Sequence, residues 1–237
     1  MEEMALIQRA VVATALVALA GFSGTALGQG DSSISANLAV TTDYVFRGYT
    51  QTGEDAAVQG GVDWEDSSGW YVGSWASKID FGPGDDASIE VDLYGGYTWE
   101  ANDVSYDLGL IYYAYPGADS DSGYDFFEAY ASLGYDLDAV SLSAALHFTP
   151  DNFGETGNGW YVTGGLSRGL SESLSVDANL GFSQVTPDFG EDYLDWNLGL
   201  SYSLSQFGLD LRYHDTDAPD CIGACDSRIV LSLSVGF

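Results

Sequence analysis

Basic residues are scarce in this chain. Of its 237 residues, 6 are Lys or Arg and 36 are Asp or Glu, so the formal net charge is −30 at pH 7. Because binding to nucleic-acid phosphates needs a basic surface, this balance excludes nucleic acid as a partner. It suits cations, lipopolysaccharide bridged by divalent ions, or simple solubility in a salty medium.

Cysteine is nearly absent as well. The chain has only two, Cys221 and Cys225, close together in a polar stretch. In an exported protein such a pair meets an oxidising compartment, where it can close into a disulfide that pins a loop. We favour this disulfide over a metal or redox site, and the sequence predicts no metal ligands.

Catalytic motifs are also missing. The chain contains two histidines, His147 and His214, and no G-x-S-x-G, no H-E-x-x-H and no phosphate-cradling glycine loop. A pairing of His214 with the adjacent Asp215 can be drawn, but no nucleophile motif accompanies it. The sequence therefore predicts no enzyme, no catalytic residue and no cofactor.

One long apolar run occurs, at the beginning of the chain. Arg9 precedes the uncharged run 10–22, and Ala26 and Gly28 supply small residues at a cleavage position. Because Glu2 and Glu3 are unusual before such a run, we suspect that translation begins at Met4. The run is shorter than the roughly 20 residues of a membrane helix, so we interpret residues 1–28 as a signal peptide. The mature domain is then 29–237, with five basic and 34 acidic residues and a net charge of −29.

The remaining chain alternates apolar and polar residues with a period of two, which is typical of strands with two different faces. In the first segment Ile34, Tyr44 and Phe46 fall on the apolar face, whereas Asn37 and Arg47 fall on the polar face. Twelve such segments can be read: 34–47, 56–65, 70–81, 87–99, 103–115, 127–136, 140–148, 160–168, 174–184, 194–204, 207–215 and 228–237.

The lengths of these segments and of their connections indicate a membrane barrel. About 9 to 14 residues is long for a strand of a soluble sandwich and matches a tilted membrane-spanning strand. Short connections alternate with longer ones, at 48–55, 82–86, 116–125, 150–159, 186–193 and 216–227. The sequence thus predicts an all-β fold, a transmembrane antiparallel up-and-down β-barrel of about twelve strands with short periplasmic turns and longer external loops.

Aromatic residues lie at many ends of the apolar faces, where interfacial girdles belong. The last segment is apolar on one face and ends on Phe237, which is similar to the signal that the outer-membrane assembly machinery reads in its clients. We therefore expect the lipid bilayer, lipopolysaccharide and this machinery as partners, and the outer membrane as the location.

Several motifs resemble those of a known family. They are Tyr44-Val45-Phe46-Arg47-Gly48, Ala57-Val58-Gln59-Gly60-Gly61, Trp70-Tyr71-Val72-Gly73, Asp80-Phe81-Gly82, Glu90-Val91-Asp92-Leu93-Tyr94-Gly95-Gly96-Tyr97, Tyr106-Asp107-Leu108-Gly109 and Tyr112-Tyr113-Ala114-Tyr115-Pro116-Gly117. In this order they resemble a proteobacterial family of outer-membrane porins of the TorF type, also described as conserved proteins of unknown function. The resemblance covers residues 36–130 and implies a location rather than an activity. The cysteine loop and the very acidic loops depart from the family pattern.

Charged residues on the inward phase are the candidate lumen and selectivity residues. The candidates are Arg47, Glu90, Asp92, Asp107, Glu128, Asp177, Asp195, Asp210, Arg212 and Arg228, with Asp63, Glu65, Glu100 and Arg168 on the same phase. Their excess of negative charge would concentrate cations and repel anions in a water-filled passage. The sequence therefore predicts a channel for small hydrophilic solutes, cationic or neutral.

Two alternatives stay beside this interpretation. Arg47, Arg212 and Arg228 can instead form ion-pair networks that fill the lumen and hold its wall rigid. The barrel can also be non-conducting and act in ligand binding or adhesion through its acidic external loops. Asp119, Asp121 and clustered neighbours could take calcium there, although the EF-hand spacing is missing.

Overall fold

The computed structural model describes residues 32–219, 221 and 223–237. The predicted signal peptide, 1–28, lies outside the described residues. Within those ranges no helix is long and apolar enough to cross a membrane.

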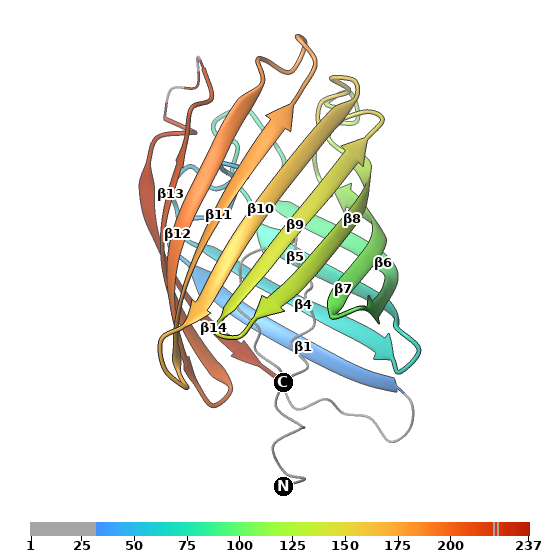
Figure 1. Cartoon of the computed structure of the whole chain (residues 1–237). Coiled ribbons are helices and arrows are strands. Elements are labelled where there is room, and N and C mark those ends of the chain that lie inside the picture. Colours follow the sequence, from blue (N-terminus) through green and yellow to red (C-terminus); the bar gives the residue numbers. More distant parts are fainter. Residues whose placement is uncertain (1–31, 220, 222) are drawn as a thin grey trace, which may run out of the picture.

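Twelve long strands form one closed antiparallel barrel, in which each strand is inclined to the barrel axis (Figure 1). The strands are β1 (Ser32–Thr41), β4 (Ala57–Asp66), β5 (Trp70–Lys78), β6 (Ile89–Ala101), β7 (Val104–Ala114), β8 (Phe126–Leu137), β9 (Val140–Thr149), β10 (Gly159–Gly169), β11 (Leu174–Gln184), β12 (Tyr193–Leu204), β13 (Phe207–Thr216) and β14 (Arg228–Gly236). Consecutive strands are neighbours, and β1 closes the ring against β14. The prediction of a twelve-stranded antiparallel barrel is confirmed.

Closure leaves no long strand with an unpaired edge among the described residues, which hydrocarbon requires because each unsatisfied backbone group there costs several kcal/mol. At the seam, β1 pairs with β14 from Asn37↔Gly236 to Thr41↔Ser232. Phe237 extends this ladder by exchanging two backbone hydrogen bonds with Ala36, at 2.8 and 3.2 Å.

The outward face of the barrel is apolar. Val58 is 62% exposed and Ile229 is 68% exposed, in register with other exposed Val, Leu and Ile side chains around the ring. Aromatic residues flank this band toward the short turns at Trp64, Trp70, Trp99, Tyr135, Tyr202 and Phe207, and toward the long loops at Tyr112, Phe148, Trp160, Phe182, Trp196 and Tyr213. Such a band with two aromatic belts fits a bilayer with interfaces at both ends.

Within the strands, the inward face carries most of the polar and charged side chains. The predicted orientation of one of them is wrong. Arg168 pairs across the sheet with Val140 and Val176 and lies in the outward register near the short-turn end. In β10 the even positions point outward, and Arg168 shares them with Trp160 and Leu166. The side chain of Arg168 therefore lies on the outer surface of the barrel.

The two ends of the barrel differ, as predicted. Short turns join the strands at one end. The turn between β6 and β7 has Asn102 and Asp103 at φ 53° and 64°, values typical of a type I′ hairpin turn. Longer loops join the strands at the opposite end. The C-terminus, Phe237, lies at the end with the short turns (Figure 1).

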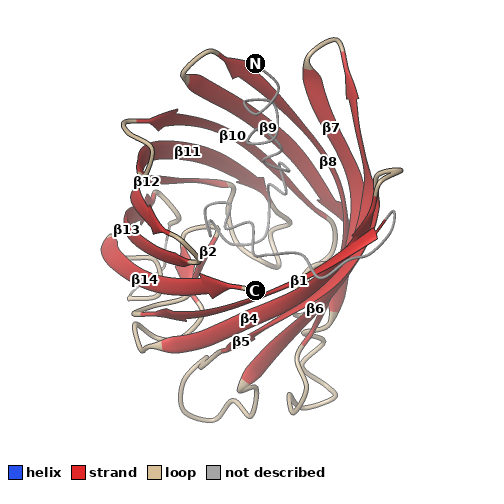
Figure 2. Cartoon of the chain, turned by 90° about the horizontal axis from the view of Figure 1, so that it is seen from below, coloured by secondary structure: helices blue, strands red, loops and turns tan. Residues whose placement is uncertain are grey.

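The first predicted strand is wrong beyond Thr41. There the chain leaves the wall, and two short strands, β2 (Val45–Phe46) and β3 (Tyr49–Thr50), form a hairpin inside the ring (Figure 2). Tyr44 and Phe46, predicted to face outward, are buried and partly buried inside the barrel. In this bend the alternation is broken only at Thr42 and Val45, and Tyr44 and Phe46 return to the apolar phase, so the pattern alone does not reveal the bend.

Candidate functional site

The chain between β1 and β4, residues 42–56, is called here the inner segment. The turn of its hairpin is formed by Arg47 and Gly48, at φ 47° and 88°. A Cβ on Gly48 would lie 2.9 Å from the Cβ of Thr216 and 3.1 Å from that of Asp195, so glycine allows the tip to touch the wall.

The inner segment reaches strands on opposite sides of the barrel. The Tyr44 hydroxyl donates a hydrogen bond of 2.9 Å to Glu90 on β6, and the Tyr49 ring packs edge-on against Tyr193 on β12, with centroids 5.3 Å apart. The segment predicted as an external loop, 48–55, therefore belongs to a structure that narrows the lumen near its long-loop end.

Arg47 holds the tip of the hairpin to β8. Its Nη2 donates to both carboxylate oxygens of Glu128, at 2.8 and 2.9 Å, and Glu128 is 1% exposed. The guanidinium lies between the rings of Phe46 and Tyr161, 4.7 and 4.2 Å from their centroids. His147 Nδ1 lies 2.8 Å from the same carboxylate, so Glu128 is shared by two partners.

Arg212 anchors a second network, on the far wall. It donates to Asp177 at 2.6 and 2.9 Å, to Asp210 at 3.1 and 3.2 Å, and to Asn197 at 2.6 Å. Gly199 on β12 lies opposite Arg212 on β13. The guanidinium occupies space that a Cβ at position 199 would overlap, so a residue without a side chain is needed here.

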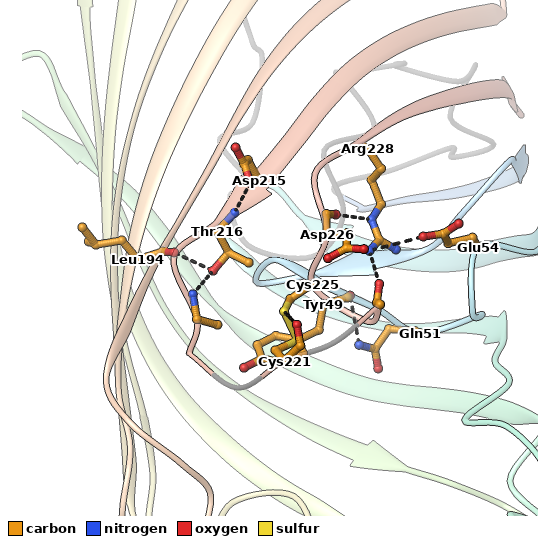
Figure 3. The surroundings of a disulfide bond; sticks show 12 residues. Tyr49, Gln51, Glu54, Leu194, Asp215, Thr216, Cys221, Cys225, Asp226 and Arg228 are labelled. Atoms are coloured by element: carbon orange, nitrogen blue, oxygen red, sulfur yellow. Dashed lines mark hydrogen bonds and ion pairs between the residues drawn. A yellow bond between two sulfur atoms is a disulfide. The ribbon is translucent and has the colours of Figure 1, made fainter.

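Arg228 anchors a third network, beside the disulfide (Figure 3). It donates to Asp43 of the inner segment at 2.8 Å and to the carbonyl of Gly223 at 2.9 Å. Cys221 and Cys225 form a disulfide in the same loop, and Ala224 accepts a 2.8 Å hydrogen bond from the Thr50 amide. This loop therefore fixes the base of the hairpin.

Several inward carboxylates have no guanidinium partner in the described structure. Glu90, Asp107 and Asp195 accept hydrogen bonds from Tyr44, Tyr71 and Tyr161, at 2.9, 2.7 and 3.3 Å, and Asp63 accepts one from Tyr94. Asp92 is fully buried, and neither of its oxygens has a hydrogen-bond partner among the described residues. Inward carboxyl groups thus outnumber the inward arginines.

The ten predicted inward acids do face the lumen, against three inward arginines rather than four, because Arg168 is outside. The sequence-based list missed Asp43, Tyr161 and Tyr193, which hold the inner segment. The polar phase of the first segment contained Asp43, but no pattern showed that the chain turns inward there.

His214 and Asp215 do not form the pair that was considered from the sequence. His214 is on the inward register of β13, whereas Asp215 is on the outward register and accepts a 2.8 Å hydrogen bond from Tyr213. His147 contacts Glu128.

A cavity of about 280 Å³ lies between the inner segment and the long loops. Its lining includes Tyr49 and Tyr193, and also Phe81, Tyr115 and Phe153. The latter three rings pack edge-on or tilted, with centroids 5.3 to 6.1 Å apart. Aromatic faces therefore dominate the external mouth.

Tyr124 supports this aromatic wall from the loop behind it. Its ring stacks on Phe153 with centroids 4.2 Å apart, and its hydroxyl donates a hydrogen bond to Asp85. That hydrogen bond raises the pKa of the Tyr124 hydroxyl above its usual range. The link joins the loop after β5 to the loop after β7.

Several acidic residues of the long loops accept hydrogen bonds within the loops. Asp125 accepts hydrogen bonds from the Tyr112 hydroxyl at 2.9 Å and the Tyr115 amide at 2.8 Å, and Asp119 accepts one from the Asp121 amide at 3.2 Å. Within the described ranges, no three His, Cys, Asp or Glu side chains are grouped so that they could hold a metal ion.

Comparison with solved structures shows the same fold. The KdgM porin aligns with a TM-score of 0.60 and 12% identity, over 86% of this chain and 99% of its own. A KdgM porin in complex with disordered oligogalacturonate gives 0.57 and 13%, over 87% and 99%, and the NanC porin gives 0.54 and 10%, over 86% and 98%. Identities this low show a common fold alone.

Comparison with curated proteins finds no match. A family profile, in contrast, matches residues 25–232, which is most of the sequence. Its family is described as a bacterial protein of unknown function, Gcw_chp. By this match the chain belongs to the Gcw_chp family of bacterial proteins.

Proposed function

We propose that this protein is an outer-membrane channel for small hydrophilic solutes, which admits cationic or neutral solutes more readily than anions. The observation that carries the proposal is the contrast between the two faces of the closed barrel. An apolar outer band suits lipid, and a polar, acidic inner wall suits a hydrated passage. The fold shared with porins is consistent with this function.

The outer membrane is the proposed location, since closed barrels with two aromatic belts are built for that bilayer. Lipopolysaccharide, bridged by divalent ions to the acidic loops, and the outer-membrane assembly machinery are the proposed partners. Phe237, paired with Ala36 at the seam, is the proposed assembly signal. The TorF type is likewise the proposed porin type, on the motifs between residues 36 and 130.

The preference for cations rests on the carboxylates that remain after pairing. Arg47, Arg212 and Arg228 each bind acidic side chains, so none of the three offers an uncommitted positive charge to an anion. Asp63, Asp107 and Asp195 receive only tyrosine hydroxyls among the described residues. Charges that face a confined passage set its selectivity, and these are negative.

A second candidate function is a non-conducting barrel that binds ligands at its external face. The inner segment favours it, because this segment touches β6, β8 and β12 and so crosses the lumen. The two functions differ in whether solutes pass the inner segment.

Swelling of liposomes that contain refolded residues 29–237 tests the proposal. Glucose, glucosamine and glucuronate are matched in size and differ in charge. We expect glucosamine and glucose to enter faster than glucuronate, and liposomes without protein to give the baseline. Glucuronate entering fastest would overturn the selectivity, and no entry of any of the three into liposomes with folded barrel would favour the second function.

A further inference from the structure

We propose that the cavity above the inner segment is a binding site for an uncharged, amphipathic ring, a ligand with a flat apolar face and a hydrogen-bonding edge. Pyranose sugars and phenolic compounds share this chemistry. The inference deepens the proposed channel and rests on it, since it names the solute class that is captured at the external mouth.

The position of the cavity is the first reason. Its floor comes from the inner segment between Phe46 and Gln51. Its walls come from the long-loop ends of β8 to β12 and from the loops after β5, β7, β9 and β11. A solute arriving from outside therefore meets this cavity before the inner segment. Its volume of about 280 Å³ is near the lower limit of about 300 Å³ for small-molecule sites.

The shape of the aromatic lining is the second reason. Phe81, Tyr115 and Phe153 hold one another in edge-on and tilted contacts, and Tyr49 is held in the same way by Tyr193. Rings fixed by their neighbours lose little freedom when a ligand packs on them. Two groups of fixed rings in the lining of a small cavity suit a flat ring.

The polar groups of the lining determine the charge of the ligand. Gln51, Asn152 and Gln184 carry amides that both donate and accept hydrogen bonds, which suits hydroxyl groups. Arg47 is the one charged residue among the described residues of the lining, and its guanidinium is bound to Glu128 and covered by two rings.

The absence of acids from the described lining is notable in a chain with 36 acidic residues. The acidic loops around the mouth would repel an anionic ligand, and no uncommitted cation inside the described lining would retain it. A cationic ligand would lose part of its hydration shell in the cavity, and no carboxylate of the described lining would replace that water. The lining therefore fits an uncharged ligand best.

Binding is tested on refolded residues 29–237 in detergent micelles by calorimetric titration, which does not depend on conduction. The probes are maltotriose and 4-hydroxybenzyl alcohol, one for each source of the ring chemistry, with galacturonate and glucosamine as charged counterparts. We expect saturable binding of at least one uncharged probe and at least tenfold weaker binding of both charged ones. Saturation by maltotriose alone assigns the site to sugars, and by the alcohol alone to phenolic rings.

The variant Phe153→Ala removes one ring of the aromatic lining. Phe207→Ala is the matched control, because it removes the same side chain from the outward register at the short-turn end of β13, away from the cavity. We expect about tenfold weaker binding for Phe153→Ala, the size typical of a lost aromatic contact, and no change for the control. Phe153→Leu keeps an apolar side chain and serves if the alanine variant does not refold, as judged by heat-modifiable migration in gels.

The two proposals fail in distinguishable ways. A barrel that conducts and binds neither uncharged probe overturns the site alone, as does binding that ignores Phe153 or that is equally tight for the charged probes. A barrel that binds an uncharged probe through Phe153 and conducts nothing overturns the channel alone.

Discussion

Arg47 and Glu128 stand 81 positions apart in the sequence and are joined inside the barrel by two hydrogen bonds from one guanidinium nitrogen, of 2.8 and 2.9 Å. Arg47 is the tip of the inner hairpin, and Glu128 belongs to the wall on β8. The pair therefore fixes the inner segment, which crosses the lumen.

The first prediction concerns this link. Arg47→Ala leaves Glu128 without its guanidinium, and loss of one partner of a buried pair typically costs about 3–5 kcal/mol, so the inner segment should detach from β8. We expect a larger unitary conductance in planar bilayers than in the unmodified barrel. Arg168→Ala, on the outward register, should leave conductance unchanged.

A double variant separates the effect of losing the Arg47–Glu128 contact from the effect of changing the charge of the lumen. Arg47→Ala combined with Glu128→Ala removes the contact and keeps the net charge of the lumen. Conductance should rise in the single and the double variant alike. A rise confined to the single variant would show that charge, and not the position of the hairpin, controls the current.

The second prediction concerns selectivity. Asp63 and Asp107 face the lumen and are hydrogen-bonded by Tyr94 and Tyr71. Asp63→Asn with Asp107→Asn removes two negative charges at nearly constant volume, so the preference for K⁺ over Cl⁻ should fall. The reversal potential under a KCl gradient measures it, with Asp138→Asn, in an exposed turn, as the control. An unchanged potential in the double variant would mean that these carboxylates do not face the conducting path.

The third prediction concerns stability. Arg212→Met leaves Asp177 and Asp210 facing each other without their common partner, and such a loss typically costs about 3–5 kcal/mol of unfolding free energy. Urea unfolding of the barrel in lipid vesicles, followed by tryptophan fluorescence, measures the change. Arg168→Met is the control and should cost little. A similar small loss at Arg212 would show that the network does not hold the wall.

The fourth prediction uses two glycines. Gly199→Ala places a methyl group against the Arg212 guanidinium, so we expect a loss of about 1–3 kcal/mol from overpacking. Gly164→Ala meets a single backbone oxygen at 3.8 Å and should be neutral or slightly stabilising. The same urea experiment compares them, and equal effects at both positions would contradict the packing argument.

The wall of the barrel could be predicted from the sequence because its physics is local. An apolar residue such as Leu198 must face lipid and its neighbour Asn197 must face the lumen, so alternation reveals the strand and its register together. Short turns such as Asn102-Asp103 carry their own sequence signature. These signals together predicted twelve strands and their order.

The inner segment could not be predicted in the same way. Tyr44 and Phe46 stay on the apolar phase of β1, and only contacts with distant residues such as Glu90 and Glu128 show that the chain has turned inward. The predicted orientation of Arg168 was also wrong. A charged residue at a strand end is stable on either face, so its charge does not decide which face it takes. The candidate site therefore depends on long-range pairing that one sequence does not display.

Single-channel recording of refolded residues 29–237 in a planar bilayer under a KCl gradient tests the proposed channel most directly. The account predicts discrete current steps that reverse at a potential favouring K⁺. A bilayer that stays silent with a folded, heat-modifiable barrel, or a reversal potential favouring Cl⁻, would contradict it.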